Sequence, residues 1–277
     1  MQMQSIPRRL YNKYSNRIEK ELYKKGLLAA QDLCLPDFMV IGSPQSGTTW
    51  LFQNLIYHPQ LYLPPNKQIH YFDRHFDMRL KSYANFFLPG EDKVKGEITP
   101  DYGILEQERI KFIHSIMPCV KLILMARNPI DRTWSAARRI FTKQSDRFWE
   151  EIDENEIYDF FLNQKYSYPG DYEPGLNYGD YSRIIKKWLS EFPREQLFIG
   201  FFDDISCEPK ALLTNIFEFL GVSSDISWDD FPFNTVFNKN PNVELPRKYR
   251  DFLEDLYCEE LERLYDQFGG KVANWRC

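Results

Sequence analysis

Hydrophobic positions along the chain form four short apolar runs, separated by longer stretches with helical spacing. Turn or polar residues bound each run, which indicates buried strands at Asp37–Gly42, Val94–Ile98, Lys121–Arg127 and Leu197–Phe202. The intervening stretches predict helices near Gly47–Tyr57, Leu105–Ile116, Ile130–Phe141, Tyr178–Glu191, Pro209–Leu220 and Pro246–Phe268. Because strands alternate with helices, we expect an α/β fold with a doubly wound parallel β-sheet flanked by helices on both faces.

Three regions depart from this pattern. Residues 1–35 are basic and lack a continuous apolar segment, so we expect a helical arm packed on the domain, with contact to a membrane surface as the alternative. Residues 143–175 interleave acidic and aromatic side chains, and residues 225–245 are rich in Asp, Asn, Phe and Pro. Long irregular segments of compact domains are often functional lids. We therefore predict a single domain over residues 36–277 with a lid at 143–175.

The first apolar run leads into a glycine-bounded loop. Gly42 and Gly47 have the GxxxxG spacing of a phosphate-binding loop, and two hydroxyl residues, Thr48 and Thr49, follow. Backbone N–H groups of such a loop form an anion site together with the start of the next helix. Thr48 stands where a Walker loop has lysine. The loop therefore predicts a P-loop-like fold and a phosphate-bearing ligand, and it argues against an ordinary ATPase.

Composition limits the remaining function classes. The 277 residues have a net charge of −5, which argues against a general affinity for nucleic acid. The five cysteines are scattered without a CxxC pair, so neither a disulfide framework nor a zinc site is indicated, and we interpret them as reduced thiols of a cytoplasmic protein. No apolar run reaches transmembrane length, so stable membrane insertion is not expected. The oligomeric state stays open.

A second anion site is predicted where the third apolar run ends. Arg127 closes that run, Pro129 suits the first turn of a helix, and Ser135 lies about two turns along it. Arginine with a hydroxyl near a helix start suits a dianionic phosphate. Taken alone, the pattern fits a structural ion pair of Arg127 and a packed Ser135 equally well.

The two sites, in this order along the chain, resemble those of the sulfotransferase family, which uses 3′-phosphoadenosine 5′-phosphosulfate (PAPS). The resemblance extends from about Asp37 to Val222 and includes Gly96–Tyr102, similar to a GExTPxY element of the Golgi and bacterial branch. It implies a PAPS-dependent enzyme that needs no metal. The residues that it implies in nucleotide binding are Ser46, Gly47, Thr48 and Thr49 at the phosphosulfate, Trp50 near the adenine, Arg127 and Ser135 at the 3′-phosphate, and Lys239 and Asn240 in a covering loop.

Three positions depart from the family pattern. Gln45 stands where the first loop usually has lysine, and Gln68 stands where the Golgi-type branch often has a glutamate general base. Ile98 replaces a lysine seen in that branch. Gln45 can still donate a hydrogen bond to the leaving group, but it supplies no positive charge. Gln45 and Gln68 therefore remain candidate catalytic residues without the expected charges.

His70 keeps a family position beside the expected acceptor pocket. Histidine is well suited to take a proton near neutral pH, and Asp73 three residues later could orient it. The alternative is a packed, hydrogen-bonded structural histidine. We favour a catalytic or substrate-orienting role.

The expected reaction is in-line transfer of a sulfuryl group from PAPS to a hydroxyl or to an amine, carbamoyl or guanidinium-type nitrogen of a small molecule. The acidic and aromatic residues at 143–175 favour a cationic natural product, such as the alkaloids of saxitoxin-type sulfotransferases, over an acidic polysaccharide. A solvated acidic lid is the alternative. Two rival functions stay open: a P-loop nucleotide kinase or NTPase, and a nucleotide-binding pseudoenzyme without transfer activity.

Overall fold

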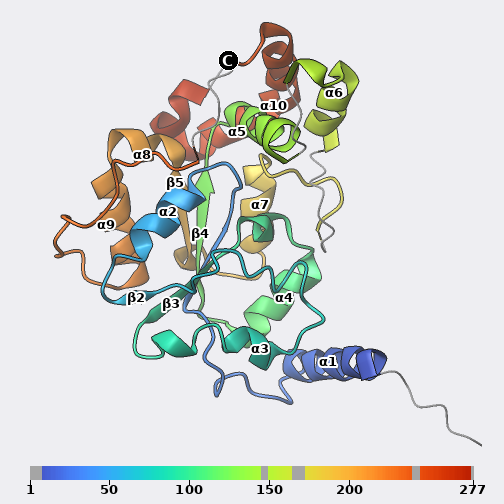
Figure 1. The fold of residues 1–277 in the computed structure, drawn as a ribbon, viewed down its shortest axis with the longest axis vertical. Coiled ribbons are helices and arrows are strands. Elements are labelled where there is room, and N and C mark those ends of the chain that lie inside the picture. Colours follow the sequence, from blue (N-terminus) through green and yellow to red (C-terminus); the bar gives the residue numbers. More distant parts are fainter. Residues whose placement is uncertain (1–7, 145–148, 164–171, 239–243, 276–277) are drawn as a thin grey trace, which may run out of the picture.

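The computed structural model describes residues 8–144, 149–163, 172–238 and 244–275, and a parallel sheet lies at its centre (Figure 1). Its strands lie in the order β2-β3-β1-β4-β5, and every paired strand is parallel to its neighbour. The predicted sheet and its four longer strands are confirmed, with ends that differ by at most one residue. The hydrophobic pattern misses β2, which is too short to form an apolar run. The strands are β1 Phe38–Gly42, β2 Leu61–Tyr62, β3 Val94–Ile98, β4 Lys121–Ala126 and β5 Leu197–Phe201.

Helices cover both faces of the sheet, as the doubly wound prediction requires. The six predicted helices are α2 Thr48–Leu55, α4 Gln107–Ile116, α5 Pro129–Arg138, α7 Tyr181–Trp188, α9 Pro209–Leu220 and α10 Arg247–Phe268. The described residues also form α1 Arg8–Lys24, α3 Leu80–Ala84, α6 Glu154–Asn163 and α8 Phe202–Cys207. In Figure 1, α2, α8 and α9 lie on one side of β4, and α4 and α7 lie on the other.

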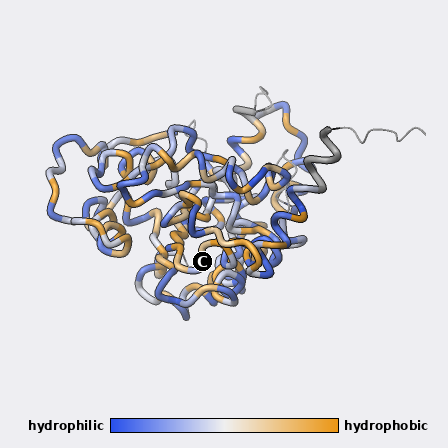
Figure 2. Tube along the Cα trace, turned by 90° about the horizontal axis from the view of Figure 1, so that it is seen from below, coloured by the Kyte–Doolittle hydropathy of each residue, from blue (hydrophilic) through white to orange (hydrophobic). Residues whose placement is uncertain are grey.

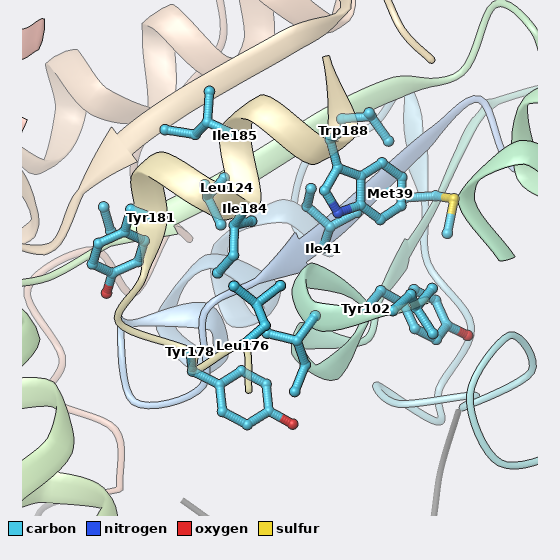
Figure 3. Close-up of a cluster of buried hydrophobic side chains, with 14 of the residues drawn as sticks. Met39, Ile41, Tyr102, Leu124, Leu176, Tyr178, Tyr181, Ile184, Ile185 and Trp188 are labelled. Atoms are coloured by element: carbon cyan, nitrogen blue, oxygen red, sulfur yellow. The ribbon is translucent and has the colours of Figure 1, made fainter. Parts of the chain in front are cut away.

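Alternate residues of β1 supply two separate cores. Met39 and Ile41 belong to the core that α4, α5, α7 and α10 share, whereas Phe38 and Val40 belong to the core of α2 and α9. This division follows from the period of two along a strand. Figure 3 shows part of the first core, with Trp188 of α7 beside β1. Because both faces are buried, the central strands read as continuous apolar runs in the sequence.

The basic N-terminal arm contains α1, which packs against α4. Lys20 of this helix is buried, and its ammonium donates to the carbonyl oxygens of Phe76 and, at 2.8 Å, of Met78. Burial lowers the pKa of Lys20 to about 8. The arm therefore holds the segment that follows His70 by hydrogen bonds to its backbone.

Hydrophobic and hydrophilic residues alternate along most of the trace (Figure 2). Within the described ranges, no helix combines the length and the apolar character needed to cross a bilayer.

The described part of the predicted lid is largely a packed helix. α6 places Phe161 in the first core, where its ring lies against the rings of Tyr249 and Phe252 from α10. The acidic side chains of α6 are exposed, and Glu154 pairs with Lys248 at 2.9 Å. Residues 145–148 and 164–171 lie outside the described ranges. The lid at 143–175, like the division into an arm and one domain over 36–277, stays a prediction.

Gly47 lies at the junction of the first loop and α2. Glycine is required there both for the backbone conformation and because there is no space for a side chain. Its φ is 83°, and a Cβ atom there would lie 2.2 Å from Cδ1 of Ile205 and 3.2 Å from the Phe202 ring. Gly175 is a matched control, because its φ is 68° but nothing lies within 4 Å of the same position.

We expect Gly175→Ala to lower the free energy of unfolding by about 1 kcal/mol, the cost of a left-handed backbone alone. Gly47→Ala should lower it by about 2 kcal/mol or more, since the side chains of α8 must also move. Denaturant titrations of both variants measure the difference. Equal losses would contradict the packing role of Gly47.

Candidate active site

The first loop brings its buried hydroxyl and the start of α2 to the carboxyl end of β1. Gly47 precedes α2 in a left-handed conformation, so the chain turns sharply from the loop into the helix. The side chain of Ser46 is fully buried, and its Oγ lies 3.4 Å from the hydroxyl of Tyr181. The first N–H groups of an α-helix have no partner within the helix. The start of α2 is therefore an anion-binding geometry, as the sequence predicts.

The two predicted anion sites meet in space. The side chain of Arg127 donates from Nη1 to the carbonyl oxygen of Gln45 at 3.1 Å, and Ser135 Oγ donates to Gln45 Oε1 at 3.3 Å. The backbone N–H of Arg127 also donates to the hydroxyl of Tyr181 at 3.1 Å. The guanidinium of Arg127 lies 4.4 Å from the centre of the Phe202 ring. Gln45, Arg127 and Ser135 thus form one continuous wall.

This wall borders a cavity of about 660 Å³, a size that suits a nucleotide. Gln45, Gly47, Thr48, Thr49 and Trp50 line it from the loop and α2. Among the described residues, its lining contains basic side chains and no carboxylate, in a chain of net charge −5. The basic side chains are Lys67, Arg127, Arg138 and Arg139. The cavity is therefore suited to a multiply charged anion.

Residues from the second irregular segment close another side of the cavity. Trp50 Nε1 donates to the carbonyl oxygen of Phe233 at 2.9 Å, and Asn238 Nδ2 donates to Thr49 Oγ1 at 3.0 Å. The segment therefore contributes wall residues from Phe233 to Asn238. The predicted loop residues Lys239 and Asn240 follow directly in the sequence, but they lie outside the described residues.

A hydrogen-bonded cluster surrounds His70. Its Nδ1 lies 2.8 Å from Oδ2 of Asp73 and 3.8 Å from Oδ2 of Asp101. Arg74 donates to Asp101 at 2.6 Å, and Tyr172 donates to Asp73 at 2.9 Å. The predicted pairing of His70 with Asp73 is thus present. His70 itself is not among the residues that line the cavity, whereas Gln68 lines it and is exposed.

The same cluster has the spacing of a cation site, but its donors are already engaged. One ligand atom from each of His70, Asp73 and Asp101 lies within 4.8 Å of the others. The Arg74 guanidinium pairs with Asp101, and Tyr178 also donates to that carboxylate at 3.1 Å. A metal ion bound there would have to displace Arg74, so the cluster is better described as a network of ion pairs and hydrogen bonds.

Positive φ values mark the edges of the site. Within the described ranges, the non-glycine residues with positive φ are Gln45 at 67°, His70 at 55° and Asn238 at 57°. This conformation costs on the order of 1–3 kcal/mol per residue and tends to persist at functional sites. Gln45 and Asn238 line the cavity, and His70 is two residues from Gln68, which also lines it.

Residues 35–245 match the model of the sulfotransferase domain family. The chain belongs to the sulfotransferase family. It is 24% identical over 313 residues to the membrane-associated sulfotransferase kil1 of Dictyostelium discoideum, an alignment that covers 84% of the chain and 65% of that protein. It is 25% identical to the heparan sulfate glucosamine 3-O-sulfotransferase 3B1 of Homo sapiens, over 72% of the chain and 50% of that protein.

A solved sulfotransferase from Alicyclobacillus acidocaldarius has the same fold, with a TM-score of 0.67 at 23% identity over 88% of the chain and 99% of that structure. The chain spans between half and two thirds of the length of the two curated relatives. These similarities identify the sulfotransferase family and its fold, and they leave the acceptor open.

The third block of the sulfotransferase resemblance is mostly a structural element. Ile98, where a lysine was expected, is buried in the core of α2 and α9. Glu97 is also buried, and its carboxylate accepts hydrogen bonds from Tyr83 and, at 2.8 Å, from Thr99. Burial raises the pKa of Glu97 to about 7. The block thus anchors the end of β3. One of its acidic residues, Asp101, belongs to the His70 cluster.

Basic residues of this sulfotransferase site went unrecognised in the sequence. Arg138 and Arg139 line the cavity from the end of α5 and the turn after it. Their spacing of three and four residues from Ser135, which places them on the same helix face, is the signal that could have identified them. Lys67 has no signal in the sequence beyond its place near His70, because its contact with the first loop depends on the tertiary fold.

Proposed function

We propose that this chain transfers a sulfuryl group from PAPS to a hydroxyl or nitrogen of a small molecule. The single observation that most supports this function is the cavity beside the first loop, with four basic side chains and the start of α2, where Gly47 provides no side-chain cap. A nucleotide with a 3′-phosphate and a 5′-phosphosulfate has separated clusters of negative charge. The cavity offers separated donors at the start of α2 and at the start of α5 to match them.

The proposed roles of the donor-binding residues rest on the family resemblance and, for all the described ones except the fully buried Ser46, on their places around the cavity. Ser46, Gly47, Thr48 and Thr49 would hold the 5′-phosphosulfate at the start of α2, and Trp50 would pack near the adenine. Arg127 and Ser135 would hold the 3′-phosphate. When bound, PAPS supplies the sulfuryl group and a phosphate leaving group. No residue of the chain needs to form a covalent bond, so positioning and hydrogen bonding would provide the catalysis.

We further propose that His70 takes the proton that the acceptor loses. Its contact with Asp73 assigns the hydrogen to Nδ1 and leaves Nε2 as the atom that accepts a proton. The His70 ring is 11% exposed, and the proposal requires that the acceptor meets it at this exposed part. Gln68 would then orient the acceptor by hydrogen bonds rather than act as a base.

The narrower acceptor class is a cationic natural product such as a guanidinium alkaloid. Its support is the acidic composition of residues 150–159, of which the described acidic side chains are exposed. The relatives include a heparan sulfate enzyme, so a glycan is the comparison class for any acceptor test. A cytoplasmic location is proposed on the free thiols of Cys34, Cys119, Cys207 and Cys258.

We expect mass spectrometry to detect addition of one sulfuryl group when the protein is incubated with PAPS and a panel of cationic, phenolic and glycan acceptors. Binding of 3′-phosphoadenosine 5′-phosphate (PAP) without transfer to any acceptor would instead identify a pseudoenzyme. Magnesium-dependent turnover of ATP would identify an NTPase or kinase. Transfer that is confined to glycans would contradict the small-molecule proposal.

Removal of the Arg127 side chain should weaken PAP binding about 10- to 100-fold, the usual effect of a lost charge-assisted hydrogen bond. Binding of AMP, which lacks the 3′-phosphate, should change by less than about threefold. Isothermal titration calorimetry of the Arg127→Ala variant with both nucleotides measures this contrast. Equal weakening of PAP and AMP would show that Arg127 does not bind the 3′-phosphate.

The His70→Ala variant should lower kcat about 10²- to 10⁴-fold, the range of a lost general base, while PAP binding stays unchanged. His75→Ala is the control, because His75 is an exposed histidine five residues along the same segment. Transfer rates at saturating PAPS and acceptor measure the effect. A folded His70→Ala variant with the full rate would exclude His70 as the base.

A further inference from the structure

Lys67 places an ammonium group at the start of α2, although it belongs to a different segment of the chain. Its Nζ donates to Thr49 Oγ1 at 2.9 Å and lies 3.3 Å from Thr48 Oγ1. Both hydroxyls belong to the first two residues of the helix, and all three residues line the cavity. Lys67 comes from the segment between β2 and His70, so the tertiary fold alone makes this contact.

The side chain at position 45 has different partners from Lys67. Gln45 Oε1 accepts from Ser135 of α5, and the Gln45 carbonyl oxygen accepts from Arg127. Both contacts direct Gln45 to the wall that α5 and the end of β4 form. Gln45 is therefore engaged by Ser135 and Arg127, whereas Lys67 contacts the hydroxyls at the proposed 5′-phosphosulfate side.

The groups around Lys67 suit an incoming anion. Arg139 repels its ammonium, Asp101 attracts it, and Thr48 and Thr49 are neutral hydrogen-bond partners. Burial lowers the pKa of Lys67 to about 8. A phosphate group placed beside Lys67 would favour the charged form of its ammonium. It would also accept the hydrogen bonds that the ammonium now donates to two neutral hydroxyls.

We propose that Lys67 is the catalytic cation of this enzyme, and that it supplies from the segment after β2 the positive charge that position 45 lacks. This inference rests on the proposed sulfuryl transfer. In that reaction the bond between sulfur and the oxygen of the 5′-phosphate breaks, and a bond forms between sulfur and the acceptor atom. The acceptor proton passes to a base. The electron pair of the broken bond stays on the 5′-phosphate oxygen, where the ammonium of Lys67 stabilises it.

A binding experiment locates Lys67 independently of any acceptor. The Lys67→Met variant keeps most of the side-chain length and removes the charge. We expect it to bind PAP about tenfold or more weakly, and to bind adenosine 3′-monophosphate, which lacks the 5′-phosphate, as the wild type does. Lys81→Met is the control, since Lys81 is an exposed lysine of α3. Equal weakening of both nucleotides, or of neither, would overturn the placement of Lys67 at the 5′-phosphate.

A charge-relocation experiment tests the catalytic step. With the acceptor found by mass spectrometry, Lys67→Met should lower kcat about 10²- to 10³-fold, the usual loss for one stabilising group. The double variant Gln45→Lys/Lys67→Met should recover at least tenfold of that loss, because it returns a cation to the cavity from the first loop. A Lys67→Met variant with a rate within threefold of wild type, or a double variant that binds PAP but recovers no rate, would overturn the catalytic role. A wild type that binds PAP and transfers nothing would overturn the proposed function and this role with it.

Discussion

The parallel pairing of β1 with β4 is the constraint on which the whole site depends. The pairing continues past the end of β1, where the N–H of Ser43 donates to the carbonyl oxygen of Met125 at 2.9 Å. This bond fixes the distance between the loop after β1 and Arg127 after β4. The buried hydroxyl of Tyr181 reinforces it, because it contacts both Ser46 and the N–H of Arg127. A shift of either strand by one residue would separate the two anion-binding groups.

A basic cavity within an acidic chain requires that the charges come from separate segments. Lys67 follows β2, Arg127 follows β4, and Arg139 follows α5. Lys67 and Arg127 are partly or largely buried, and burial opposes the charged form of a base. The described lining has no carboxylate, although Asp101 attracts Lys67 and Asp131 attracts Arg127 from outside it. The mutual repulsion of the basic groups is relieved when an anion binds, so the electrostatic energy of the empty cavity favours occupancy.

Much of the fold was predictable because its signals are local. The apolar runs of the buried strands, the Gly42–Gly47 spacing and the helix Pro209–Leu220 each depend on residues that are neighbours in sequence. α6 escaped prediction because its aromatic stripe is interrupted by acidic residues on the exposed face. Its burial depends on α10, which lies about a hundred residues further along the chain.

The site was predictable only in part for the same reason. The partnership of Arg127, Ser135 and the first loop could be inferred from a resemblance, and the structure brings those residues together. The contact of Lys67 with Thr49 has no sequence signature, because eighteen positions separate the two residues and a complete strand lies between them. Ile98 shows the converse. A position at which the resemblance leads one to expect charge is occupied here by a core residue, since Ile98 at the end of β3 packs in the core of α2 and α9.

The hydroxyl of Thr49 has one consequence for how a ligand enters and leaves. It accepts hydrogen bonds from both Lys67 and Asn238. A phosphate that binds there must take the two donors away from this hydroxyl. The free energy of binding therefore gains only the difference between the hydrogen bonds formed and those lost. On departure the donors return to a partner already in place, and no buried ammonium is left without an acceptor. Binding and release thus exchange one set of hydrogen bonds for another, which limits the cost of replacing one nucleotide by the next.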